Sequence, residues 1–227
     1  MNGGLAIFVK TPGVSPLKTR LALGMGNESQ RWYGLAVDAV KSVALEAQKK
    51  CGINVYWAVA ETNAMQHPLW QSMPRLAQAE DKQSGLGERM GRVMRMLIRQ
   101  HQFGLLVGAD APQVCANDIE AAIDFLNNEN PRLVLGPASD GGFWCVGSNQ
   151  KFPIELWQSI SYSQANTYRD FIAAFSPFAE VLNLRTLSDV DEIDDLTSCY
   201  LEMHSLKRMT DEQVILMRVF GQFELPK

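Results

Sequence analysis

Cysteine and histidine are scarce in this sequence, with four cysteines and three histidines among 227 residues. The cysteines form no Cys-x-x-Cys pair, so neither a zinc ribbon nor a dithiol redox motif is indicated. His67, His101 and His204 share no spacing typical of metal ligands. Because no secretory leader pattern is visible either, we expect reduced thiols and a cytoplasmic protein.

Long apolar runs are also absent, and none approaches the length needed to cross a membrane. The formal net charge is −4, whereas nucleic-acid-binding proteins usually present a broad basic face. We therefore expect neither a membrane span nor a nucleic-acid partner, while the oligomeric state stays open. The chain has no evident linker or repeat, and its length suffices to bury a core, so we expect a single domain over residues 1–227.

Three common catalytic motifs are missing. Without a Gly-x-Ser-x-Gly motif, serine-hydrolase chemistry has no support. No Gly-x-Gly-x-x-Gly follows the first apolar run, which argues against a dinucleotide-binding Rossmann domain. A Walker phosphate loop ending at Lys18 would need glycine immediately before it, but Leu17 stands there and Pro16 has no N–H for a phosphate.

A basic loop, residues 10–20 (KTPGVSPLKTR), is the most informative segment that is present. It follows the apolar run 5–9, which predicts a buried first strand. In an α/β sheet, ligands bind where such strands end. A loop with fixed positive charge at that position favours an anion, and we predict that it binds the phosphates of a nucleotide. The alternative is ordinary solvated surface charge.

Strand and helix patterns alternate along the chain. The apolar patterns predict strands at 5–9, 53–59, 103–109, 133–136, 143–146 and 180–184. They predict helices from residue 27 or 28 to Gly52, and at 86–100, 116–127, 164–175, 192–205 and 210–220. This alternation predicts an α/β fold, a three-layer α/β/α sandwich whose mainly parallel sheet is covered on both faces. The two short neighbouring strands near 133–146 predict a small antiparallel element.

A carboxylate ends one of the buried strands. Asp110 follows the apolar run 105–109, and Ala111-Pro112 then breaks the extended pattern. A carboxylate at this edge would lie beside the basic loop, where it could hold a divalent cation against a bound diphosphate. Mg²⁺ typically binds one or two protein carboxylates together with phosphate oxygens. A turn or helix-capping role is the alternative, although Asn117 is nearer to the next helix.

Two further acidic segments have both structural and functional interpretations. Ser139-Asp140-Gly141-Gly142 is typical of a hairpin turn, although its surroundings are longer than a tight hairpin needs. Five acids lie within residues 189–196, and some of them suit the N-terminus of a helix. Asp189 and Asp191 precede that helix and are freer to reach a metal.

Five segments in this order resemble a known family: FVKTPGVSPLKTRL, SGLGERM, VGADAPQV, GPASDGGFWCVG and DVDEIDDL. They resemble the glycosyltransferase-A-like bacterial proteins labelled selenodomain-associated or uncharacterised transferases. These are relatives of nucleotide-diphospho-sugar transferases and of cytidylyl- and guanylyltransferases. The resemblance covers roughly residues 4–200 and implies the nucleotide-diphospho-sugar transferase (GT-A-like) fold.

The resemblance also implies roles for individual residues. The nucleotide and its phosphates would be bound by Lys10, Gly13, Lys18, Arg20, Gly87 and Arg89. A Mg²⁺ or Mn²⁺ ion would be bound by Asp110 and Asp191. Gly141 and Gly142 would line the acceptor side, and Asp140 or Glu88 would serve as the general base.

These roles lead to one main hypothesis and two alternatives. The main one is metal-dependent transfer of a sugar from a nucleotide-diphospho-sugar to an unknown acceptor. The first alternative is a nucleotidyltransferase that uses a nucleoside triphosphate. The second is a non-catalytic nucleotide-binding domain. The non-catalytic alternative stays open because this sequence departs from the family pattern at two places. Ser139 replaces the usual Glu before the Asp-Gly-Gly, and Tyr162-Ser163-Gln164 replaces a Trp-Ser-Thr cluster.

Overall fold

The computed structural model describes residues 2–79 and 84–220 and contains one mixed sheet. Its seven strands lie in the order β3-β2-β1-β4-β6-β5-β7. They are β1 (Gly3–Val9), β2 (Asn54–Val59), β3 (Arg75–Ala77), β4 (Phe103–Gly108), β5 (Arg132–Pro137), β6 (Phe143–Ser148) and β7 (Glu180–Asn183). Neighbouring strands are parallel except at β6, which is antiparallel to both β4 and β5.

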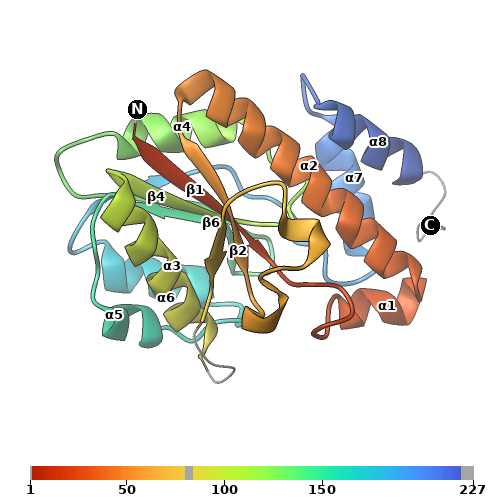
Figure 1. The fold of residues 1–227 in the computed structure, drawn as a ribbon, viewed down its shortest axis with the longest axis horizontal. Helices are drawn as coiled ribbons and strands as arrows, with labels where there is room; N and C mark the ends of the chain where they lie inside the picture. The colour runs from red at the N-terminus through yellow and green to blue at the C-terminus, as the bar shows by residue number, and fades with distance from the viewer. Residues whose placement is uncertain (1, 80–83, 221–227) are drawn as a thin grey trace.

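Helices cover both faces of this sheet. They are α1 (Thr19–Met25), α2 (Glu28–Cys51), α3 (Leu86–Gln100), α4 (Ala116–Leu126), α5 (Ile154–Gln158), α6 (Thr167–Phe175), α7 (Asp195–His204) and α8 (Asp211–Phe220). One core cluster joins the sheet to α2, α4, α7 and α8, and another joins it to α3, α5 and α6. Figure 1 shows the first group toward the top and right of the view and the second at lower left. The predicted three-layer α/β/α fold is therefore confirmed.

Hydrophobic periodicity explains these layers. On β1, Leu5 and Ile7 enter the first core cluster and Ala6 the second, as expected for a strand buried on both faces. On α2, the buried side chains recur at helical spacing along one stripe, and the helix ends where Gly52 adopts the left-handed conformation at φ 68°. Within the described residues, no helix combines the length and apolarity required to cross a bilayer.

The differences from the predicted elements are short or lie at boundaries. The sequence patterns missed α1, β3 and α5, which span 7, 3 and 5 residues and are too short to show a period. Two predicted helices begin later than expected, because α6 starts at Thr167 and α7 at Asp195. The predicted antiparallel element is present as the pairing of β5 with β6.

The strand order creates a switch point at β1. Its neighbours are β2 on one side and β4 on the other, so successive crossovers run in opposite directions and leave a crevice at the carboxyl ends of β1 and β4. Because β6 is antiparallel to β4, its first residues and the preceding loop meet the same edge. The basic loop, Asp110 and the 138–142 loop therefore converge.

Candidate functional site

A pocket of about 970 Å³ opens at this edge. Its walls come from the ends of β1 and β4, the start of β6, the basic loop, and segments within 162–167 and 189–195. This volume is typical of small-molecule and cofactor sites. Residues predicted from separate motifs, among them Lys18, Asp110 and Asp191, thus share one cavity.

The ammonium group of Lys18 makes the central ionic contacts of the pocket. Its Nζ lies 2.8 Å from Oδ2 of Asp110 and 3.1 Å from Oδ1 of Asp191, and it donates to the carbonyl oxygen of Val190 at 2.6 Å. The Lys18 side chain is only 6% exposed. These contacts join the loop after β1, the end of β4 and the segment before α7.

Backbone strain is also concentrated here. Lys18 has φ 45° and ψ 45°, in the left-handed region that non-glycine residues rarely adopt. Ser163, at φ 59°, also lines the pocket, and among the described residues only these two non-glycine residues have positive φ. Such conformations persist where surrounding contacts hold them, and they cluster at functional sites.

The electrostatics of the pocket favour a bound cation. Burial alone would disfavour charge on Lys18 and Asp110, but their attraction prevails, so the pKa of Lys18 lies above its usual value and that of Asp110 below. Burial, together with repulsion from Asp110, raises the pKa of Asp189 to about 8. Asp189 is therefore mostly protonated near neutral pH, and the two carboxylates of Asp110 and Asp191 face the one buried ammonium of Lys18.

The donor chemistry of this cluster fits a hard divalent cation. Carboxylate oxygens are the preferred protein ligands of Mg²⁺ and suit Mn²⁺ as well. In residues 2–79 and 84–220, however, no three His, Cys, Asp or Glu side chains form a group able to hold a metal ion. Instead, the ammonium of Lys18 bridges Asp110 and Asp191. The ligand types therefore fit the predicted ion, while the present arrangement holds a lysine.

The other cations predicted to bind phosphates surround the same cavity. Arg20 forms ion pairs with Asp191 and Glu192, and its side chain is 61% exposed. Lys10 and Arg89 also line the pocket, and Arg89 donates from Nε to the carbonyl of Ser84. A pocket with cations on several walls and carboxylates at its centre suits an anion bridged by a metal.

Four predicted residues do not line this pocket: Gly13, Gly87, Glu88 and Gly141. Gly13, at φ 78°, borders a neighbouring open hollow on the outer side of the basic loop. Gly87 allows α3 to approach α5, since a Cβ there would lie 2.3 Å from the carbonyl oxygen of Trp157. Glu88 accepts hydrogen bonds from Ser84 and Gln158. The start of α3 therefore contributes Arg89, rather than Gly87 or Glu88, to the cavity.

The 138–142 loop serves as a turn and also as a wall. The Oδ1 atom of Asp140 accepts a hydrogen bond from the Gly142 N–H, as in an Asx turn, while both residues line the pocket. Gly141 adopts φ 89°, and its carbonyl accepts from the N–H of Tyr168. This loop is thus docked on the start of α6.

The acidic segment, residues 189–196, contributes some side chains to the pocket and others to the turn before α7. Asp195 accepts from the backbone N–H groups of Asp191 and Glu192 and so orders the turn before α7. Asp118, in a capping box with Cys115, caps α4 in place of Asn117, which leaves Asp110 without a capping role.

Sequence reasoning missed two supporting residues. The carboxylate of Glu61 accepts from the N–H and hydroxyl of Thr11 and from the hydroxyl of Ser15, which ties down the basic loop. The amide nitrogen of Gln78 donates to the carbonyls of Val9 and Ala58, and no described residue donates to its amide oxygen at the pocket wall. Glu61 follows β2 and Gln78 follows β3. Neither lies in a recognisable motif, so no local sequence pattern identified them.

Comparisons with known proteins agree with the fold. Residues 42–164, more than half of the chain, match the family described as "Uncharacterized protein conserved in bacteria (DUF2064)". A Desulfovibrio desulfuricans protein, described provisionally as a nucleotide-diphospho-sugar transferase, aligns with a TM-score of 0.79 and 23% identity over 96% of each chain. No protein of curated function matches the sequence.

Other solved structures share the fold at lower sequence identity. CMP:2-keto-3-deoxy-manno-octonic acid synthetase, in complex with CTP, has a TM-score of 0.56 and 12% identity over 91% of this chain and 100% of that one. The 4-diphosphocytidyl-2C-methyl-D-erythritol synthase of Anaerococcus prevotii has a TM-score of 0.52 and 9% identity over 98% and 99%. At these identities the likeness establishes the fold. The chain belongs to the DUF2064 family and has the fold of nucleotide-diphospho-sugar transferases and cytidylyltransferases.

Proposed function

We propose that this protein is a metal-dependent transferase that acts on a nucleotide-diphospho-sugar, with an acceptor still to be identified. The observation that carries the proposal is the contact of Lys18 with both Asp110 and Asp191, at 2.8 and 3.1 Å, inside the pocket at the switch point. We include a single domain over residues 1–227 and a cytoplasmic location in this proposal.

On the donor side, the basic residues Lys10, Lys18, Arg20 and Arg89 bind the diphosphate. Asp110 and Asp191 hold Mg²⁺ or Mn²⁺, and a bound cation would favour ionisation of Asp189 nearby. Bound there, the ion would offset the charge that grows on the departing nucleoside diphosphate. Such stabilisation is strongest for a cation shielded from water, so Lys18, at 6% exposure, contributes more than Arg20, at 61%.

On the acceptor side, Asp140 provides an exposed carboxylate at the pocket wall. Its role is that of a general base that takes the proton from an acceptor hydroxyl. Gly141 and Gly142 keep the adjacent backbone free of side chains.

Titration calorimetry with UDP or GDP in the presence of Mn²⁺ tests the proposal. We expect the wild type to bind and Asp110→Asn to lose the metal-dependent binding, because the substitution removes a charged ligand. Asp38→Asn, at an exposed acid on α2, is the matched control and should bind as the wild type does. Equal binding by Asp110→Asn, with an unchanged circular dichroism spectrum, would contradict the proposal.

A nucleotidyltransferase is the second candidate, favoured by the fold shared with the CTP-bound synthetase. Such an enzyme would use a nucleoside triphosphate and release pyrophosphate, whereas sugar transfer releases free UDP or GDP. Gly13 is the only glycine of the basic loop and borders the outer hollow, which disfavours a glycine-rich triphosphate cradle. Product analysis separates the two, and binding without any turnover would indicate a non-catalytic nucleotide-binding domain.

A further inference from the structure

The ammonium group of Lys18 lies between Asp110 and Asp191, the two carboxylates that would bind the proposed metal ion. Its ammonium lies within hydrogen-bond distance of Asp110 and Asp191, and the side chain is 6% exposed. The third bond, to the carbonyl of Val190, completes its donor set of three N–H groups. The lysine is therefore held in place as the counter-ion of this pair.

A divalent cation bound by Asp110 and Asp191 would enter the same space. The divalent cation and the ammonium of Lys18 would then share the same carboxylates and repel each other strongly, because charges in a partly buried pocket are screened less than in bulk water. Arg20 also pairs with Asp191, but it is 61% exposed and therefore better screened by water. The main obstacle to a metal binding alone is thus Lys18.

A diphosphate changes this balance. It brings negative charge to the basic loop and offers the ammonium of Lys18 a new partner. Once Lys18 turns to the phosphate, the oxygens of Asp110 and Asp191 become available as ligands. We infer, on the basis of the proposed function, that Lys18 is an internal counter-ion which makes metal binding depend on prior or simultaneous binding of the diphosphate.

The coupling is reciprocal. If a nucleoside diphosphate raises the affinity for the metal by some factor, the metal raises the affinity for the nucleotide by the same factor. Couplings between two sites are typically roughly 5- to 150-fold. We expect the wild type to fall in that range.

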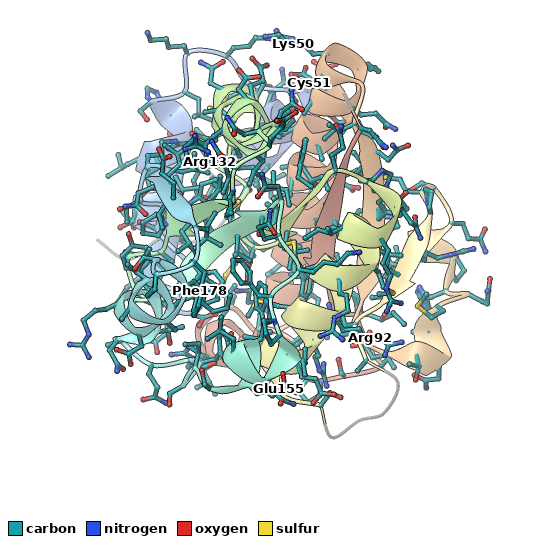
Figure 2. The ribbon with its side chains drawn as sticks, turned by 90° about the vertical axis from the view of Figure 1, so that its left-hand side faces the viewer. Lys50, Cys51, Arg92, Arg132, Glu155 and Phe178 are labelled. Atoms are coloured by element: carbon teal, nitrogen blue, oxygen red, sulfur yellow. The ribbon has the colours of Figure 1, made fainter. Side chains whose placement is uncertain are left out.

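The first test measures Mn²⁺ binding without nucleotide, from the electron paramagnetic resonance signal of the free ion. Lys18→Met should bind Mn²⁺ alone roughly 5- to 150-fold more tightly than the wild type, because the competing charge is gone. Lys50→Met is the control, since Lys50 forms an exposed pair with Glu120 and lies at the edge of the molecule (Figure 2). It should leave the affinity for Mn²⁺ unchanged.

The second test measures how much a nucleotide changes Mn²⁺ binding, first in the wild type and then in Lys18→Met. Mn²⁺ is titrated into the wild type with and without excess UDP or GDP, and a protein-free blank corrects for metal–nucleotide complexes. The proposed function already requires tighter Mn²⁺ binding with the nucleotide, and the inference requires in addition that this enhancement is smaller in Lys18→Met than in the wild type.

The outcomes separate this inference from the proposed function. If Lys18→Met and the wild type bind Mn²⁺ alone equally well, the inference is wrong while the proposed function stands. If the wild type binds both ligands but independently, nucleotide binding does not depend on the metal, and both are wrong. If the wild type binds neither ligand, both are wrong. If Lys18→Met does not fold, Lys18→Gln, which keeps hydrogen-bonding capacity but removes the charge, takes its place in the same titrations.

Discussion

At the scale of single residues, the site depends on side chains that hold other side chains. Lys18 contacts Asp110 and Asp191 from the end of a loop whose earlier residues are anchored by side-chain hydrogen bonds. Glu61 supplies that support through Thr11 and Ser15, and the indole N–H of Trp70 donates to the same threonine hydroxyl. Hydrogen bonds to a charged group are among the stronger ones in proteins.

We predict that Glu61→Ala weakens nucleotide binding by about tenfold, equivalent to about 1.4 kcal/mol, because the basic loop loses its anchor. The melting temperature should fall by only a few degrees, since the core is untouched. Calorimetry with UDP or GDP and Mn²⁺ measures the affinity. Glu120→Ala, which removes a glutamate from the exposed pair with Lys50, is the control. Unchanged affinity in Glu61→Ala would show that the loop holds its shape unaided.

At the scale of elements, the pocket depends on how loops dock on helices. Gly141 combines φ 89° with a close approach, since a Cβ there would lie 2.0 Å from the carbonyl oxygen of Ala165. At Gly142 the nearest atom to a Cβ is a side-chain oxygen of Asp140, at 3.1 Å. The two adjacent glycines therefore differ in how much they tolerate a methyl group.

We predict that Gly141→Ala destabilises the protein by about 2 kcal/mol, through positive φ and the backbone clash. Gly142→Ala should cost clearly less, because the Asp140 side chain can move. Thermal or urea unfolding measures both. Equal melting temperatures for the two variants would mean that the 138–142 loop is not docked on α6 as described.

At the scale of the whole molecule, the pocket depends on the segment that connects β7 to α7, residues 184–194. Arg185 binds Asp118 through Nε, at 2.9 Å from Oδ1, and donates to the carbonyl of Gln113. Glu202 accepts from the N–H and hydroxyl of Ser188. These contacts anchor residues 185–188 to α4 and α7 and so bring Asp189 and Asp191 to the far side of the sheet's crevice.

We predict that Arg185→Met destabilises the protein by about 3 kcal/mol and weakens metal-dependent nucleotide binding. The reason is that Asp118, nearly buried at 9% side-chain exposure, would be left without its partner. Adding Asp118→Asn should restore part of both losses, because the uncompensated charge is removed. A double-mutant cycle by urea unfolding measures this coupling. Strictly additive losses would show that the two side chains act independently.

Much of the architecture could be predicted from the sequence because periodicity is a local property. The apolar stripe of α2, the run before Asp110 and the paired strands near 133–146 each lie within one element, and all three are found where they were expected. The shared location of the basic loop and Asp110 also followed, since parallel strands end at a common edge.

The sequence by itself determined the layers, the mainly parallel sheet and the edge at which the charged loops meet. Only the tertiary structure decided which charges touch. Lys18 lies 92 positions from Asp110 and 173 from Asp191, and strand order with its crossovers brings them together. The same holds for the role of Glu61 and for the start of α3, where of the two predicted residues Arg89 lines the pocket and Gly87 does not. Contacts between distant segments depend on packing that no local pattern encodes.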